Sequence, residues 1–103
     1  MIRHIVLYRF KPEFTDKEII PLFNKLTQLK NLVPGVEAMQ WGKYCGKGDK
    51  NAGYTYGLSV DIADESVFLT YSPHPLHNEV RQQMAPLLAE DEPLLMFDFL
   101  LTK

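Results

Sequence analysis

The first strand constrains the fold of this chain most, because its side chains alternate like those of a β-strand and are apolar on both faces. Within residues 2–10, Val6 and Tyr8 lie on one side, whereas Ile5 and Leu7 lie on the other. A strand that is apolar on both faces has to be covered on both faces. One helical layer covers only one of them, so we expect the sheet to need a second cover.

A helix is predicted over residues 16–32. The segment Thr15-Asp-Lys-Glu18 has the spacing of a capping box, in which the threonine hydroxyl and the glutamate carboxylate each satisfy a free backbone amide. Apolar residues then recur three and four positions apart, which indicates one buried face. Pro21 lies inside this helix and lacks an amide donor, so we expect a bend or a loose first turn there. Pro34-Gly35 should end the helix.

The rest of the chain supplies three further strand patterns and two helix patterns. The strands are predicted over residues 36–44, 54–62 and 94–101, and the helices over residues 65–71 and from Pro75 onward. A long glycine-rich loop joins the first two of these strands into a hairpin. Asp64 is placed to cap the short helix, Pro75 suits a first helical position, and Pro86 should disturb the end of the second helix.

The resulting order is strand, helix, strand, strand, helix, strand. This is the α+β, ferredoxin-like split βαβ pattern, in which both helices cover one face of a four-stranded antiparallel sheet. The other face would remain open and apolar; we assign to it Ile5, Leu7, Met39, Trp41, Leu95, Phe97, Phe99 and Leu101. Such a patch is larger than a monomer usually exposes. A second copy is its simplest cover, so we expect a homodimer that forms a dimeric α/β barrel.

Length and charge exclude several classes of protein. The 103 residues fit one domain, residues 1–103, with a single core. The formal net charge is −2 and the basic residues are scattered among acidic ones, which argues against nucleic acid as a partner. No stretch approaches the roughly 20 apolar residues that span a bilayer, so we expect no membrane partner.

Cys45 is the only cysteine, so the chain has no intrachain disulfide. This favours a reducing compartment. The chain also begins with an alternating strand pattern rather than a leader with a long apolar stretch. We therefore expect a cytoplasmic protein.

The segment Tyr71-Ser-Pro-His-Pro-Leu-His77 carries the chemistry of the chain. It places a phenol and two imidazoles on a short, proline-stiffened connection between two helices. His4, the third histidine, lies in the middle of the first strand. Imidazole and phenol are proton-transfer groups, and imidazole changes charge most readily near pH 7. Tyr71, His77 and His4 are therefore the candidate catalytic residues.

Structural roles explain the same residues, and they are the commoner case for buried polar groups. Pro73 and Pro75 would fix a turn, His77 would buttress the following helix, and Tyr71 would pack in the core. His74 and His77 are three positions apart, but no carboxylate lies at a spacing that completes a metal site locally. We therefore expect neither a metal nor another cofactor.

Several motifs together give the chain a resemblance to the stress-responsive dimeric α/β-barrel family, also called the Dabb family. They run over nearly the whole chain: Ile2-Arg-His-Ile-Val-Leu-Tyr-Arg-Phe-Lys11, Leu32-Val-Pro-Gly-Val36, Trp41-Gly42, Gly53-Tyr54-Thr55, Tyr71-Ser-Pro-His-Pro-Leu-His77 and Phe97-Asp98-Phe99. The resemblance implies a homodimer whose two sheets pack together with the helices outside. It implies less about activity, because most relatives have no assigned reaction.

One relative is a plant polyketide cyclase that performs an aldol condensation without metal or organic cofactor. The resemblance places its working tyrosine and histidine at Tyr71 and His77 and a further pocket histidine at His4. Another pocket histidine of that enzyme corresponds to Tyr56 here, and Ser72-Pro73 also departs from its pattern, so we do not expect an identical reaction. In an aldol step His77 would be the base and Tyr71 the donor to the oxyanion.

We expect the pocket between the sheet and the helices. The residues assigned to it beside the candidate catalytic groups are His74, Tyr56, Val6 and Leu58, a mostly apolar set that suits a small aromatic or acyl-chain ligand. Binding of a small apolar metabolite is the first functional hypothesis. A cofactor-independent cyclase or aldol-type lyase, a purely structural stress-linked oligomer and a cofactor-free monooxygenase are the alternatives.

Overall fold

The computed structural model describes residues 1–102, and its elements follow the order that the sequence predicts. They are β1 (Ile2–Tyr8), α1 (Asp16–Leu26), α2 (Leu29–Leu32), β2 (Val36–Lys43), β3 (Tyr56–Ile62), α3 (Phe68–Tyr71), α4 (Pro75–Met84) and β4 (Leu94–Leu100). Short 3₁₀ turns, Glu65–Val67 and Ala85–Leu87, precede α3 and follow α4. None of the helices in residues 1–102 is both long and apolar enough to cross a bilayer.

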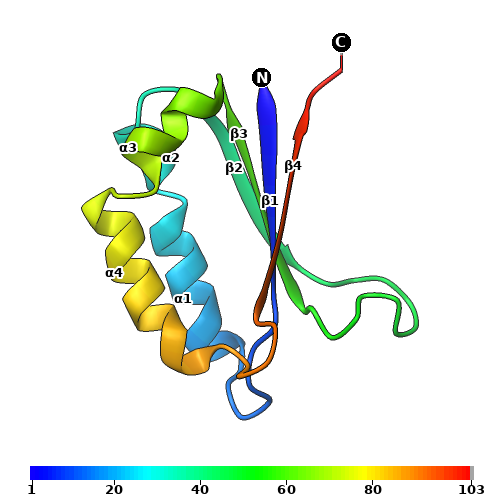
Figure 1. Cartoon of the computed structure of the whole chain (residues 1–103). Coiled ribbons are helices and arrows are strands. Elements are labelled where there is room, and N and C mark those ends of the chain that lie inside the picture. The colour runs from blue at the N-terminus through cyan, green and yellow to red at the C-terminus, as the bar shows by residue number, and fades with distance from the viewer. Residues whose placement is uncertain (103) are drawn as a thin grey trace.

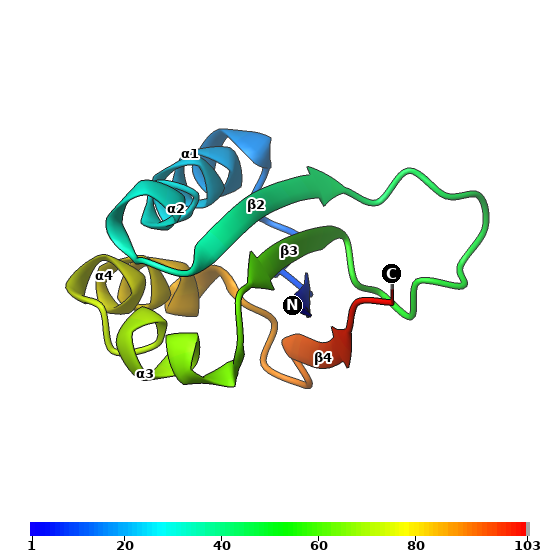
Figure 2. The ribbon, with the colours of Figure 1, turned by 90° about the horizontal axis from the view of Figure 1, so that it is seen from above.

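The four strands form one antiparallel sheet in the order β2-β3-β1-β4. Helices α1 and α4 pack side by side on one face of this sheet, and the connection between β2 and β3 extends away on the opposite side (Figures 1 and 2). This arrangement confirms the predicted ferredoxin-like α+β fold. The core lies between the sheet and the helices, where Phe23, Leu29, Val60 and Ile62 have no exposed surface.

Helix α1 begins where the sequence predicts and ends earlier. The capping box is complete, because Thr15 accepts from the Lys17 amide while Glu18 accepts from the Thr15 amide. The helix continues through Pro21 without a break, and the bend expected there stays a prediction. The helix is interrupted after Leu26, where the Thr27 hydroxyl donates to the Asn24 carbonyl. A side chain that bonds the backbone in this way competes with the regular helical ladder.

The turn after α2 requires glycine for two reasons. Gly35 has φ +90°, a left-handed conformation that a residue with a Cβ rarely adopts, and its Cβ would lie 2.6 Å from Val67 Cγ2. The chain therefore reverses tightly from α2 into β2. This agrees with the helix stop that Pro34-Gly35 predicts.

A β-bulge at the start of β2 changes which side chains face the helices. Val36 pairs with Ile62 and Ala38 pairs with Asp61, so one extra residue enters β2 between them. An extra residue exchanges the two faces for the rest of the strand. Met39 and Trp41 therefore face the helices, and their assignment to the open face is wrong. The Trp41 ring stacks on Phe23 of α1 with 5.2 Å between the ring centroids.

The open face is nevertheless apolar. Strand register places Ile5 opposite Phe97 and Leu7 opposite Leu95 on this face, with Phe99 next along β4. Phe97 is 65% exposed. Leu101 was also assigned here, but it lies beyond the end of β4, and its amide donates to the Met1 carbonyl. We call the five residues Ile5, Leu7, Leu95, Phe97 and Phe99 the open-face patch.

Candidate functional site

A cavity of about 170 Å³ lies between the sheet and helix α4. Its walls come from β1, β3, β4, α1, α4 and the end of α3; the lining residues are His4, Val6, Tyr8, Leu26, Leu58, Tyr71, His77, Val80, Arg81, Met84, Leu88, Leu94 and Met96. Most of these side chains are apolar. The cavity brings together the three candidate catalytic residues and the expected pocket residues Val6 and Leu58.

A larger hollow of about 660 Å³ lies over the opposite face of the sheet, next to the connection between β2 and β3. It is shallow and open to solvent, and it contains part of the open-face patch. Ligand sites are typically concave and have a few convergent polar groups. The smaller cavity has both properties, so it is the candidate functional site.

The junction between α3 and α4 positions Tyr71 and His77. Tyr71 ends α3, and α4 starts at Pro75, whose fixed φ suits a first helical position. The two aromatic rings meet edge to face with 5.0 Å between their centroids and an interplanar angle of 62°. His77 thus lies on the first turn of α4 and faces the same cavity as Tyr71.

The Tyr71 side chain is almost fully buried, with 2% of its surface exposed. Burial raises the pKa of its phenol above the ordinary value, so the hydroxyl stays protonated at neutral pH. Its hydroxyl makes no hydrogen bond to another residue in the described part of the chain. A protonated hydroxyl in this cavity is therefore free to donate to a bound molecule.

The His77 imidazole is held in its neutral form. Burial lowers its pKa, and the nearby positive charge of Arg81 lowers the pKa further. Nδ1 of this ring is buried and has no hydrogen-bond partner among residues 1–102. A neutral imidazole has one nitrogen that accepts a proton. His77 therefore has the protonation state that a general base needs.

The third polar group of the cavity is His4, which is paired with a carboxylate. The register of β1 and β4 places His4 opposite Asp98, and Nδ1 of His4 lies 2.5 Å from Oδ1 of Asp98. The carboxylate can only accept, so Nδ1 carries the proton and Nε2 of a neutral ring is left as an acceptor. His4 also packs edge to face on Phe68 at 5.2 Å. These contacts fix the orientation of its ring in the cavity wall.

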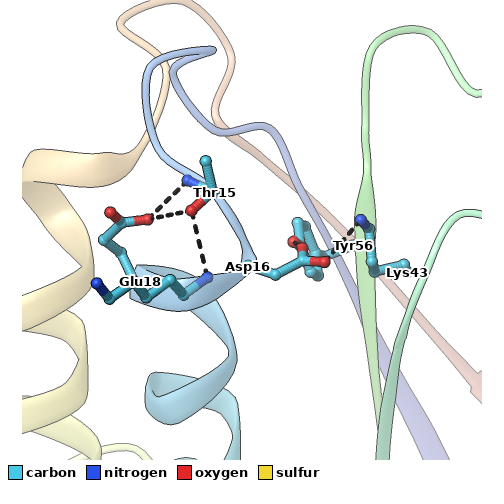
Figure 3. A network of polar contacts seen from close by, with 6 residues as sticks. Thr15, Asp16, Glu18, Lys43 and Tyr56 are labelled. Carbon is cyan, nitrogen blue, oxygen red and sulfur yellow. Dashed lines mark hydrogen bonds and ion pairs between the residues drawn. The ribbon is translucent and has the colours of Figure 1, made fainter.

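Two residues expected in the pocket are not among those that line it. His74 caps helix α4, where its Nδ1 accepts from the Leu76 amide at 3.1 Å. The Tyr56 hydroxyl donates to the Asp16 carboxylate, which also binds Nζ of Lys43 at 3.0 Å (Figure 3). This contact and burial raise the pKa of the Tyr56 phenol. Tyr56 therefore anchors the start of α1 to the sheet.

Three polar residues of the site were not predicted from the sequence. Asp98 is an acidic residue in an apolar strand, and the strand order shows that it lies beside His4 in the site. Arg81 lies one helical turn after His77, and the helix face shows that it lines the cavity. Tyr8 also lines the cavity, and burial raises its pKa. In residues 1–102 no group of three or more His, Cys, Asp or Glu side chains is arranged to hold a metal ion.

The fold and the site define a class of protein: a ferredoxin-like α+β domain with a small, largely apolar cavity that contains a tyrosine and two histidines. Residues 2–100 match the family model of the stress responsive A/B barrel domain, Dabb. The chain belongs to this family.

Known relatives agree with the assignment. Olivetolic acid cyclase from Cannabis sativa is 28% identical over 76 residues, which are 74% of this chain and 75% of the cyclase. A dimeric ferredoxin-like protein of unknown function from Thermobifida fusca is 27% identical, with a TM-score of 0.80 over 97% of this chain and 90% of that one. Hydroxynitrile lyase from Passiflora edulis shares the fold at 22% identity, with a TM-score of 0.81 over 99% of this chain and 94% of the lyase.

Proposed function

We propose that the cavity binds a small, mainly apolar molecule and that Tyr71, His77 and His4 are its polar contacts. The observation that carries this proposal is the convergence of three hydrogen-bonding groups on one cavity whose other walls are mostly apolar. The buried Nδ1 of His77 has no hydrogen-bond partner among residues 1–102, which costs free energy unless a bound molecule or water satisfies it. A ligand with one or two polar atoms would do so.

The volume of the cavity limits the size of this ligand. A cavity of about 150 Å³ is large enough to admit benzene. At about 170 Å³, the present cavity matches a molecule with a single ring and a short substituent. Larger ligands would have to displace flexible lining side chains such as Met84 or Met96.

Calorimetric titration with benzyl alcohol tests this proposal, because the molecule combines one ring with one hydroxyl. We expect a dissociation constant of about 0.1–1 mM, the range typical of a ligand with so few atoms. Val6→Phe and Val80→Phe place an extra ring in the cavity from the sheet and from α4, respectively, and should abolish binding.

Leu69→Phe is the matched control, because Leu69 is 78% exposed and the same ring would lie on the surface. Its binding should equal that of the original protein. Thermal melting shows whether each variant folds. Because the two substitutions lie in different walls of the cavity, the test can still be made if one of the variants does not fold. Absence of binding to the folded original protein, or unchanged binding in both folded filled variants, would contradict the proposal.

We also propose that two copies pair through the open-face patch and that the protein works in the cytoplasm. The Thermobifida fusca relative is described as dimeric, which supports pairing. A continuous apolar patch on a sheet suits a self-complementary, two-fold interface. Should the cavity bind nothing, this assembly would leave the structural role as the function.

A second candidate function is cofactor-independent cyclase or aldol-type lyase chemistry, as the similarity to olivetolic acid cyclase supports. The specific observation in its favour is a neutral imidazole beside a free phenol in one cavity. His77 would remove a proton next to a carbonyl group, and the Tyr71 hydroxyl would donate to the resulting oxyanion. The proton would then pass from His77 to the product or to water.

A further inference from the structure

One cation at the edge of the cavity, Arg81, has no carboxylate partner among residues 1–102. Arg81 follows His77 by one turn of α4, so both side chains lie on the helix face that also carries Val80 and Met84. Arg81 lines the cavity while most of the residue remains exposed to solvent. This places its charged end at the mouth of the cavity rather than within it.

The other cation beside α4 does have an acidic partner, because Nζ of Lys25 lies 2.8 Å from the Glu79 carboxylate. The Asp98 carboxylate is bound to His4. The guanidinium of Arg81 donates to the neutral side-chain oxygen of Asn78 and forms no ion pair with any described residue. The guanidinium has five N–H donors, and the bond to Asn78 uses one of them. The remaining donors are available to a ligand.

We infer that the cavity selects a small organic anion, whose apolar ring lies inside while its carboxylate or other acidic group binds Arg81 at the mouth. This inference rests on the proposed function and adds the chemical class of the ligand. An arginine fork binds carboxylates in a bidentate, charge-assisted manner. Inside the cavity, the protonated Tyr71 hydroxyl offers a hydrogen-bond donor to a further polar atom of the same ligand.

The test compares three probes that share one ring and differ in charge. Benzoate is negative at pH 7.5, benzyl alcohol is neutral and benzylamine is positive. We expect benzoate to bind about five- to tenfold more tightly than benzyl alcohol, and benzylamine to bind most weakly. Added salt should weaken the binding of benzoate and leave that of benzyl alcohol unchanged.

Arg81→Gln keeps a long polar side chain and a good helix former but removes the charge. It should remove the preference for benzoate, so that benzoate binds no more tightly than benzyl alcohol. Arg81→Lys should restore part of the preference for benzoate. Lys30→Gln is the control for net charge, because Lys30 lies in α2, away from the cavity lining, and should have no effect.

The outcomes separate this inference from the proposed function. Equal binding of benzoate and benzyl alcohol to the original protein overturns the inference and leaves the proposed function standing. A preference for benzoate that persists in Arg81→Gln also overturns it, because another group would then hold the anion. If none of the three probes binds, the proposed function fails and this inference fails with it.

Discussion

His77 predicts a pH dependence of stability. Its pKa is lowered in the folded protein relative to the ordinary value of 6.5 that applies to the unfolded chain, so the unfolded chain binds a proton first as the pH falls. The contribution of His77 to the free energy of unfolding is therefore fully present above pH 6.5 and decreases below it, until the folded protein also becomes protonated.

Urea unfolding at pH values from 7.5 to 5 measures this contribution as the difference between the original protein and His77→Gln. We expect the original protein to lose more stability than the variant as the pH falls. Identical pH profiles would show that burial does not shift the His77 pKa.

At the scale of single residues, the spacing in the sequence was enough to predict two polar groups of the cavity, Tyr71 and His77. The end of α3 and the start of α4 are adjacent in the chain, so the two side chains lie close together. His4 was predicted because a histidine is unusual in an apolar strand. Asp98 was not predicted, since its contact with His4 depends on which strands are neighbours in the sheet. His74 and Tyr56 have other partners, which the sequence pattern does not specify.

At the scale of secondary structure, the elements were predictable where local chemistry determines them. The Thr15 capping box, Gly35 and the short helix after Asp64 follow directly from residue type and spacing. The sequence does not reveal the bulge in β2. After the extra residue the side chains alternate as before, but each one points to the opposite face of the sheet. That exchange explains why Trp41 packs on Phe23 instead of contributing to the open-face patch.

The cyclase hypothesis depends on the junction of α3 and α4, which places His77 beside Tyr71. It can be tested without knowing the natural substrate. Acetophenone has one ring and a carbonyl group with neighbouring protons, and loss of those protons can be followed by NMR as exchange with deuterium oxide. If His77 is a base, the original protein should accelerate exchange by roughly 10²-fold or more over buffer. His77→Gln and Tyr71→Phe should each remove most of this acceleration.

Leu69→Ala is the control, because it changes an exposed side chain of α3 and should exchange acetophenone at the original rate. Exchange that stays at the rate of buffer, with the probe shown to be bound, would rule out His77 as a base for such protons. The binding proposal would be unaffected by that result.

At the scale of the whole molecule, we propose that a second copy of the chain covers the open-face patch. Phe97→Asp places a charge at its most exposed ring and should convert the dimer to monomer at micromolar concentration. Sedimentation equilibrium measures the mass directly. Leu69→Asp adds the same charge on α3 and should leave the dimer intact; a monomeric original protein would refute the pairing.

If the cavity between the sheet and α4 is a ligand site, crystals soaked with 4-bromophenol should hold this molecule there. The bromine scatters anomalously, so its position is found independently of the protein coordinates. We expect a bromine peak inside the cavity, with the phenol oxygen within hydrogen-bond distance of Tyr71, His77 or His4. Bromine peaks confined to surface grooves, with the cavity filled by rearranged side chains, would contradict it.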